Sequence, residues 1–146
     1  MYAIQGLIAA VGRILLVAIF LVSAVTLYIL KFSTAVDMLV AEGVPREGMP
    51  NAQHMIIGAA VFTLIGSLCV MLGFKARFGA LLLAVFLCLA TYYFHDFWNF
   101  PQDSERFQTE QIQFTKNVSM LGAMLFILAA GSGPGSVDRR KVTITV

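Results

Sequence analysis

Four apolar segments, each long enough to cross a lipid bilayer, constrain this chain more than any other feature. A transmembrane α-helix needs about 20 mostly apolar residues, because the hydrocarbon core of a bilayer is about 30 Å thick. The segments that reach this length are approximately residues 7–30, 55–74, 78–98 and 114–131. The sequence therefore predicts an all-α integral membrane protein, a four-helix bundle that forms a single domain over residues 1–146.

Composition supports a membrane setting. Residues of hydrophobic type make up 59% of the chain and charged residues 12%, whereas an average soluble domain has about 25% charged residues. A soluble domain of this length could not bury so much apolar surface. The net charge is only +2, and no basic run is interleaved with aromatic residues, so nucleic acid is excluded as a partner. Lipid is the expected surrounding.

The distribution of basic residues predicts how the bundle is oriented. Lys and Arg near the ends of short connections favour the cytoplasmic side. The second connection carries Lys75 and Arg77 and no acid. The tail, residues 132–146, carries Arg139, Arg140 and Lys141 against the single acid Asp138. Acidic residues outnumber basic ones in the first and third connections. Both termini are therefore predicted to lie in the cytoplasm.

The first connection has the pattern of a short helix. Thr34 and Asp37 resemble an N-cap pair, and Gly43 followed by Pro45 is typical of a helix end. The apolar residues between these signals include Val36, Leu39 and Val40. We expect a short external amphipathic helix between the first two spans, lying on the membrane interface.

Polar side chains of several helices gather at the predicted outer end of the bundle. The catalytic candidates are His95 and Asp96, because an adjacent imidazole and carboxylate can exchange protons. The cofactor-binding candidates are His54, Tyr92, His95, Gln113, Lys116 and Asn117. Such groups can donate hydrogen bonds to the carbonyls of a quinone, whose ring would lie among aromatics. The alternative is a structural polar cap, and no metal site is predicted because the histidines lack ligand spacing.

Two ion pairs are predicted within the membrane domain. Antiparallel packing of the third and fourth spans would bring Asp96 close to Lys116. Arg13 lies inside the first span, and Asp138 follows the last span on the same side. An intramembrane charge is costly unless it is paired, so we expect the pairs Asp96–Lys116 and Arg13–Asp138.

Small residues recur at helical spacing in the two central spans. They are Ala59, Thr63 and Ser67 in the second span, and Ala80, Ala84, Cys88 and Thr91 in the third. Such stripes allow helices to approach closely in a membrane. We interpret them as packing surfaces and not as binding sites.

Several stretches resemble the DoxX family of small bacterial four-helix membrane proteins. They are "GRILLVAIFLVSA", "GFKARFGALLLAVFLCLATYYFHDFW" and "EQIQFTKNVSMLGAMLFILAAGSGPGSVD". The resemblance implies a four-span fold in the bacterial inner membrane. Many members of the family carry a lysine soon after the "SA" that ends the first helix. In this sequence the lysine lies further along the chain, at Lys31.

Two functional hypotheses follow. In the first, which rests on the resemblance, the chain is the membrane subunit or partner of a quinone-linked oxidoreductase or of a thiol and oxidant-stress system. A soluble redox partner would then be required, because the chain has no flavin, haem or iron–sulfur motif. In the second hypothesis the chain is a non-catalytic scaffold or an accessory subunit of a larger complex. Association of several copies is left open.

Overall fold

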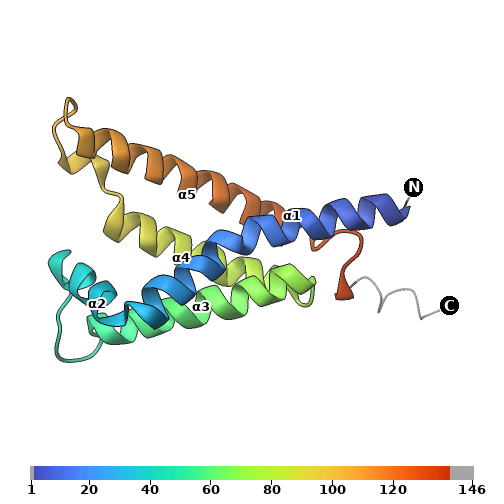
Figure 1. The fold of residues 1–146 in the computed structure, drawn as a ribbon, viewed down its shortest axis with the longest axis horizontal. Helices are drawn as coiled ribbons and strands as arrows, with labels where there is room; N and C mark the ends of the chain where they lie inside the picture. Colours follow the sequence, from blue (N-terminus) through green and yellow to red (C-terminus); the bar gives the residue numbers. More distant parts are fainter. Residues whose placement is uncertain (1, 139–146) are drawn as a thin grey trace.

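The computed structural model describes residues 2–138, and all of its regular elements are helices (Figure 1). In chain order they are α1 (Tyr2–Ser23), η1 (Ala24–Leu30), α2 (Phe32–Ala41), α3 (Ala52–Leu72), α4 (Ala76–Phe94), η2 (Phe97–Asn99) and α5 (Glu105–Ala130). Within this part of the chain there is no strand. The prediction of an all-helical fold is confirmed.

Four helices are long and apolar enough to cross a membrane. They cover Tyr2–Leu30, in which α1 continues into η1, Ala52–Leu72, Ala76–Asn99 and Glu105–Ala130. The last begins well before the predicted residue 114, because the first turns of α5 are polar and hydropathy does not detect them. Ser104 caps this helix, and its hydroxyl accepts a hydrogen bond from the Phe107 N–H at 3.1 Å.

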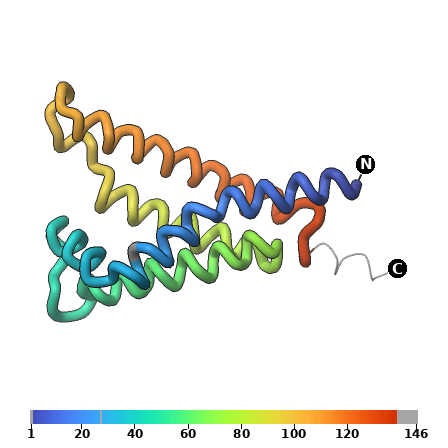
Figure 2. Tube along the Cα trace, in the orientation of Figure 1, coloured from blue at the N-terminus to red at the C-terminus, as the bar shows by residue number. Residues whose placement is uncertain are grey.

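The four long helices pack in the order α1, α3, α4, α5. α3 lies between α1 and α4, while α5 packs against α4 and η2 at the edge of the bundle (Figure 1). Tyr2 and the segment after α5 lie at one end of the bundle, called here the terminal end, and α2 lies at the other, the α2 end (Figure 2). The start of α1 and the segment after α5 lie at one side (Figure 2), which agrees with an even number of spans. Which end faces the cytoplasm stays a prediction.

The closest helix crossing joins α3 and α4. Both helices carry a glycine there, and a Cβ on Gly79 would lie 2.5 Å from the Cys69 Cβ and 2.7 Å from the Gly66 carbonyl oxygen. Around this crossing the side chains of Leu83 and Met124 are fully buried. The small-residue surfaces predicted on these helices largely coincide with the contact, except that Cys88 is exposed.

The short helix predicted in the first connection is α2. It packs on α3 through a buried face that includes Val36 and Leu39. The predicted cap is not formed, because Lys31 occupies the N-cap and no side chain caps the helix. Asp37 forms an ion pair with Arg46 instead. The chain leaves the helix through Gly43, whose φ of 90° favours glycine.

Candidate binding cavity at the α2 end

An apolar cavity of about 200 Å³, partly open to the surface, lies between the helices near the α2 end. Side chains from η1, α2, α3 and α4 line it. They are Tyr28, Leu39, Met55, Ile56, Gly58, Ala59, Phe62, Phe86, Leu89, Ala90, Tyr93 and Phe94. Hydrocarbon and aromatic groups dominate this lining, so the cavity is suited to an apolar group. We call it the inner cavity.

A second cavity, of about 460 Å³, lies between the loop of residues 42–50 and the neighbouring ends of α3 and α4. Met55 and Tyr93 line both cavities. The second cavity, called here the vestibule, therefore adjoins the inner cavity across these two side chains. Together they offer adjoining sites of opposite character, one apolar and one partly polar.

The π-helical segment η1 brings Tyr28 to the inner cavity. The Lys31 N–H donates to the carbonyl of Thr26 at 3.1 Å, the five-residue bond of a π-helix. The Tyr28 ring meets the Phe86 ring edge to face, with 6.3 Å between centroids. A change of helical pitch rotates the following side chains, and such segments are frequent at functional sites. The position of Tyr28 therefore depends on η1.

Contacts within the chain hold the vestibule loop in place. The Ala52 N–H donates to the carbonyl of Pro45 at 2.9 Å, and the Val44 N–H to that of Leu39 at 3.2 Å. Asn51 caps α3, because its side-chain oxygen accepts from the His54 N–H at 3.0 Å. These bonds tie the loop to α2 and α3. These hydrogen bonds therefore fix the backbone of the loop that lines the vestibule.

The charge in the vestibule is negative. Glu42 and Glu47 line it, and none of its described lining residues is basic. Arg46, the base between them, forms an ion pair with Asp37 on α2. A ligand that enters the vestibule therefore meets two carboxylates beside an apolar cavity.

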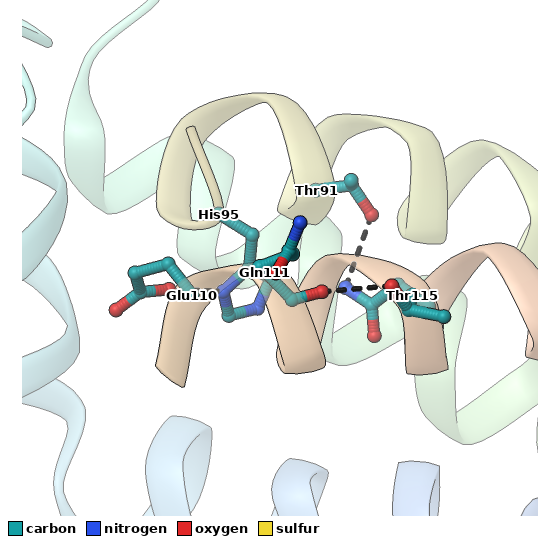
Figure 3. Close-up of polar contacts among 6 residues, drawn as sticks. Thr91, His95, Glu110, Gln111 and Thr115 are labelled. Carbon is teal, nitrogen blue, oxygen red and sulfur yellow. Dashed lines mark hydrogen bonds and ion pairs between the residues drawn. The ribbon is translucent and has the colours of Figure 1, made fainter. Parts of the chain in front are cut away.

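The predicted polar cluster is only partly assembled. His95 follows α4, and its Nδ1 lies 2.8 Å from a carboxylate oxygen of Glu110 on α5. One turn deeper, the amide of Asn117 donates to the hydroxyl of Thr91 at 3.0 Å. Figure 3 shows both contact regions between α4 and α5. These polar groups link two helices, and none of them lines either cavity.

The other predicted site residues lie apart from this contact. The carboxylate of Asp96 accepts from the Asn99 amide at 2.5 Å, and Lys116 is exposed, so the predicted pair Asp96–Lys116 is not formed. Gln113 and Tyr92 are also exposed. The ring of His54 lies 2.6 Å from the side-chain oxygen of its neighbour Asn51. The register of α5 on α4 faces Glu110 toward His95 and leaves Lys116 outside.

The second predicted pair, Arg13–Asp138, is not formed, and each of the two residues has other partners. The Arg13 guanidinium donates to the carbonyls of Ser132 at 2.5 Å and Gly135 at 2.9 Å. The Asp138 carboxylate accepts from the backbone N–H groups of Lys75 at 3.0 Å and Ala76 at 3.3 Å, at the start of α4. Both residues secure the segment after α5, but through backbone groups. The tail bases at 139–141 lie outside the described residues.

The cavity residues were not recognised in the sequence as a site. Tyr28, Phe62 and Phe86 appear there as ordinary apolar residues of the spans, and only Gly58 interrupts the pattern. A Cβ placed on Gly58 would meet no atom within 4 Å. A glycine within an apolar helical segment was the signal available in the sequence, because glycine costs a helix about 1 kcal/mol relative to alanine. Within the described residues, no three potential metal ligands lie together.

Comparison with known proteins identifies a different family from the one expected. Residues 49–143 match the SURF4 family. A Surfeit locus protein 4 homolog of Schizosaccharomyces pombe is 33% identical over 72 residues, 49% of this chain and 24% of that protein. The ER-derived vesicles protein ERV29 of Saccharomyces cerevisiae is 28% identical over 81 residues, 56% of this chain and 26% of that protein. The match thus spans about a quarter of these two relatives.

One relative has a similar length. The inner membrane protein YphA of Escherichia coli is 28% identical over 138 residues, 94% of this chain and 93% of that protein. No solved structure matches. The expected resemblance to the DoxX family was wrong, since the matching family is SURF4. The quinone-linked oxidoreductase function inferred from that resemblance is therefore withdrawn as well.

Proposed function

Since the chain belongs to the SURF4 family, we propose that it is a multi-pass membrane protein that binds an amphiphilic ligand at its α2 end. The observation that carries this proposal is the pair of adjoining cavities, which share Met55 and Tyr93. The apolar part of the ligand would occupy the inner cavity. Its polar end would lie in the vestibule.

The acidic residues that line the vestibule favour a ligand with a positive charge. Glu42 and Glu47 line it, and the nearby base Arg46 is engaged by Asp37. A cationic head group would compensate these carboxylates, whereas an anionic one would be repelled. We therefore propose an amphiphile with a long apolar group and a positively charged head.

For the location, we propose the bacterial inner membrane. Support comes from YphA, a protein named for the inner membrane, which matches this chain over 93% of its own length. The charge pattern of the connections favours the terminal end in the cytoplasm. The vestibule would then open on the external side.

Photochemical labelling tests the ligand class. A photoactivatable long-chain amine and the fatty acid of the same chain length would be added separately to the protein in lipid nanodiscs, and labelled peptides mapped by mass spectrometry. We expect preferential labelling by the amine on α3 and α4 around Phe62 and Phe86, which line the inner cavity. Equal labelling by both probes would exclude a role for the carboxylates.

A cavity-filling variant tests the place of binding. Gly58→Leu adds a side chain where no atom lies within 4 Å, so it should occupy the inner cavity without disturbing the fold. Gly12→Leu is the matched control, because Gly12 also faces open space but lies on α1 outside both cavities. We expect Gly58→Leu alone to abolish labelling by the amine. Undiminished labelling of a folded Gly58→Leu protein would contradict the proposal.

A further inference from the structure

The inner cavity is too small to hold a long apolar chain by itself. Its volume is about 200 Å³, whereas pockets that bury drug-sized ligands have volumes of about 300–1,000 Å³. The adjoining vestibule does not suit the rest of such a chain, because it is partly polar and carries Glu42 and Glu47. A long-chain ligand with its head in the vestibule must therefore extend out of the inner cavity through an opening.

Leu89 on α4 marks that opening. It lines the inner cavity and is 48% exposed, so it lies where the cavity meets the surface. The other residues that line this cavity are buried or half-buried. Ala90 beside it and Gly58 on α3 are small, and a Cβ on Gly58 would meet no atom within 4 Å. The inner cavity therefore opens toward the side of the bundle at Leu89.

The surface around Leu89 is apolar. Leu81, Val85 and Leu89 are all exposed, and their four-residue intervals place them in one stripe along α4. The chain has no charged residue between Arg77 and His95, and α3 has no Asp, Glu, Lys or Arg. Both helices are long and apolar enough to cross a membrane, and an exposed apolar face of such a helix contacts lipid. The opening at Leu89 therefore faces the acyl chains of the bilayer.

The depth of Leu89 agrees with a lipid surrounding. α4 has 19 residues, and at 1.5 Å per residue it is about 28 Å long, close to the thickness of about 30 Å of the hydrocarbon core. Leu89 lies about 8 Å along α4 from Phe94 at the α2 end, and Gly58 lies about 9 Å along α3 from Ala52 at the same end. The opening therefore lies within the hydrocarbon core, in the leaflet nearest the α2 end.

The vestibule, the inner cavity and the opening follow one another in the order of the parts of a lipid. The vestibule lies at the α2 end beside the loop of residues 42–50, and the opening lies deeper. A ligand with its head in the vestibule and its chain leaving at Leu89 would have the direction and the depth of the lipids in the surrounding leaflet.

We propose that the inner cavity opens sideways into the bilayer at Leu89, and that its ligand is a membrane lipid with a cationic head group. This lipid enters at Leu89 and leaves most of its chain among the bilayer lipids. The inference rests on the proposed function, to which it adds the source of the ligand, its route of entry and the position of its chain.

A bulky residue at the opening tests the route. Leu89→Trp should narrow the opening. Leu81→Trp is the matched control, because Leu81 is 49% exposed on the same stripe but lines neither cavity. Each protein in lipid nanodiscs would be labelled with a photoactivatable long-chain amine, and the labelled peptides of the inner cavity quantified. We expect labelling to fall about tenfold in Leu89→Trp, because the indole displaces methylene groups of the ligand, and to stay unchanged in Leu81→Trp.

A short photoactivatable amine, which fits within the two cavities, shows whether the variants keep an intact site. It should label the parent protein and both variants equally, because its chain does not reach the opening. Undiminished labelling of Leu89→Trp by the long-chain amine, an equal loss with both amines, or an equal loss in Leu81→Trp would overturn the inference alone. Absence of labelling by both amines in the parent protein would refute the proposed function as well.

Chain length provides a test without a substitution. Amines of increasing chain length would compete with the photoactivatable long-chain amine for the parent protein, each at the same mole fraction in the nanodisc bilayer. Longer chains extend through the opening into lipid, so competition should rise with chain length and then stay constant. Competition that declines once the chain exceeds the length that fills the inner cavity would show a closed site and contradict the inference.

Discussion

Arg13 illustrates how a single charged residue is accommodated at the terminal end. The residue is only 7% exposed, and its guanidinium donates to the carbonyls of Ser132, Pro134 and Gly135. A fork of several donors suits such a set of acceptors better than an ammonium group does. Arg13 therefore links α1 to the segment after α5. Among the described residues, no other side chain of α1 forms a hydrogen bond with that segment.

We predict that Arg13→Met destabilises the protein. The substitution keeps an apolar stem but leaves three carbonyls without a donor, and hydrogen bonds from charged groups contribute about 1.5–3 kcal/mol each to stability. The expected loss in the free energy of unfolding is about 2–3 kcal/mol after partial compensation by water. Thermal unfolding in detergent measures it. The control is Lys116→Met, which removes an exposed cation; an equal loss in both variants would show that Arg13 has no special role.

At the scale of the elements, the contact between α4 and α5 depends on a polar pair at the α2 end. His95 and Glu110 lie 2.8 Å apart, and their side chains are 23% and 21% exposed. Below them Asn117 bonds to Thr91. At this end α5 diverges from α1 and α3 (Figure 1), and these two polar contacts join α4 to α5 beside the ring contacts of Phe97 with Phe107 and Phe114.

A double-mutant cycle should reveal this coupling. We expect His95→Ala and Glu110→Ala each to lower stability, and the double variant to lose less than the two single losses combined, by about 1 kcal/mol. The pair Asp37–Arg46 is the control, since its side chains are 60% and 55% exposed, and exposed pairs contribute about 0–1 kcal/mol. Additive effects at His95 and Glu110 would disprove the coupling. Thermal unfolding of the four proteins provides the values.

At the scale of the whole molecule, the bundle is organised around the crossing of α3 and α4. The carbonyl of Gly66 and the Cβ of Cys69 occupy the space that a Cβ on Gly79 would need. Leu83, which would contact a Cβ on Gly66, is fully buried at the same level. Two glycines on facing helices therefore set how closely the two central helices approach.

We predict that Gly79→Ala disturbs the packing of the whole bundle. Alanine favours a helix by about 1 kcal/mol over glycine, but its methyl group would lie 2.5 Å from the Cys69 Cβ. Overpacking of this kind costs about 1–3 kcal/mol, so we expect a lower unfolding temperature. Gly12→Ala, where no atom lies within 4 Å, should be neutral or slightly stabilising. The reverse order of the two unfolding temperatures would refute this view of the crossing.

Much of the architecture could be predicted from residue order. Transfer of a long apolar segment into lipid depends on that segment alone, so all four spans and α2 were found. The polar first turns of α5 were missed because they carry no hydropathy signal. The family was misjudged because apolar spans with a basic connection occur in many membrane proteins, and the motifs quoted for the resemblance consist mostly of such spans.

The candidate site was less predictable for a physical reason. His95 and Glu110 meet, and Asp96 and Lys116 do not, because the register of α5 on α4 decides which side chains face each other. That register follows from packing along the whole contact between the two helices. Residue spacing within one helix indicates a shared face, but not the residue opposite it.

The sequence by itself determined the apolar character of the chain, the number of long helices, and that the start of α1 and the segment after α5 lie at one end of the bundle (Figure 2). The free energy of placing an apolar segment in lipid depends on that segment alone, so the number of long helices can be read from the sequence. An even number of such helices brings the two ends of the bundle's chain path to one side. Only the tertiary structure decided the inner cavity and the vestibule, because four elements line the first and the η1 segment sets the position of Tyr28. Tertiary packing also decided that Arg13 binds carbonyls and that one polar side of α5 faces outward. Contacts between segments distant in the chain depend on the packing of all of them together.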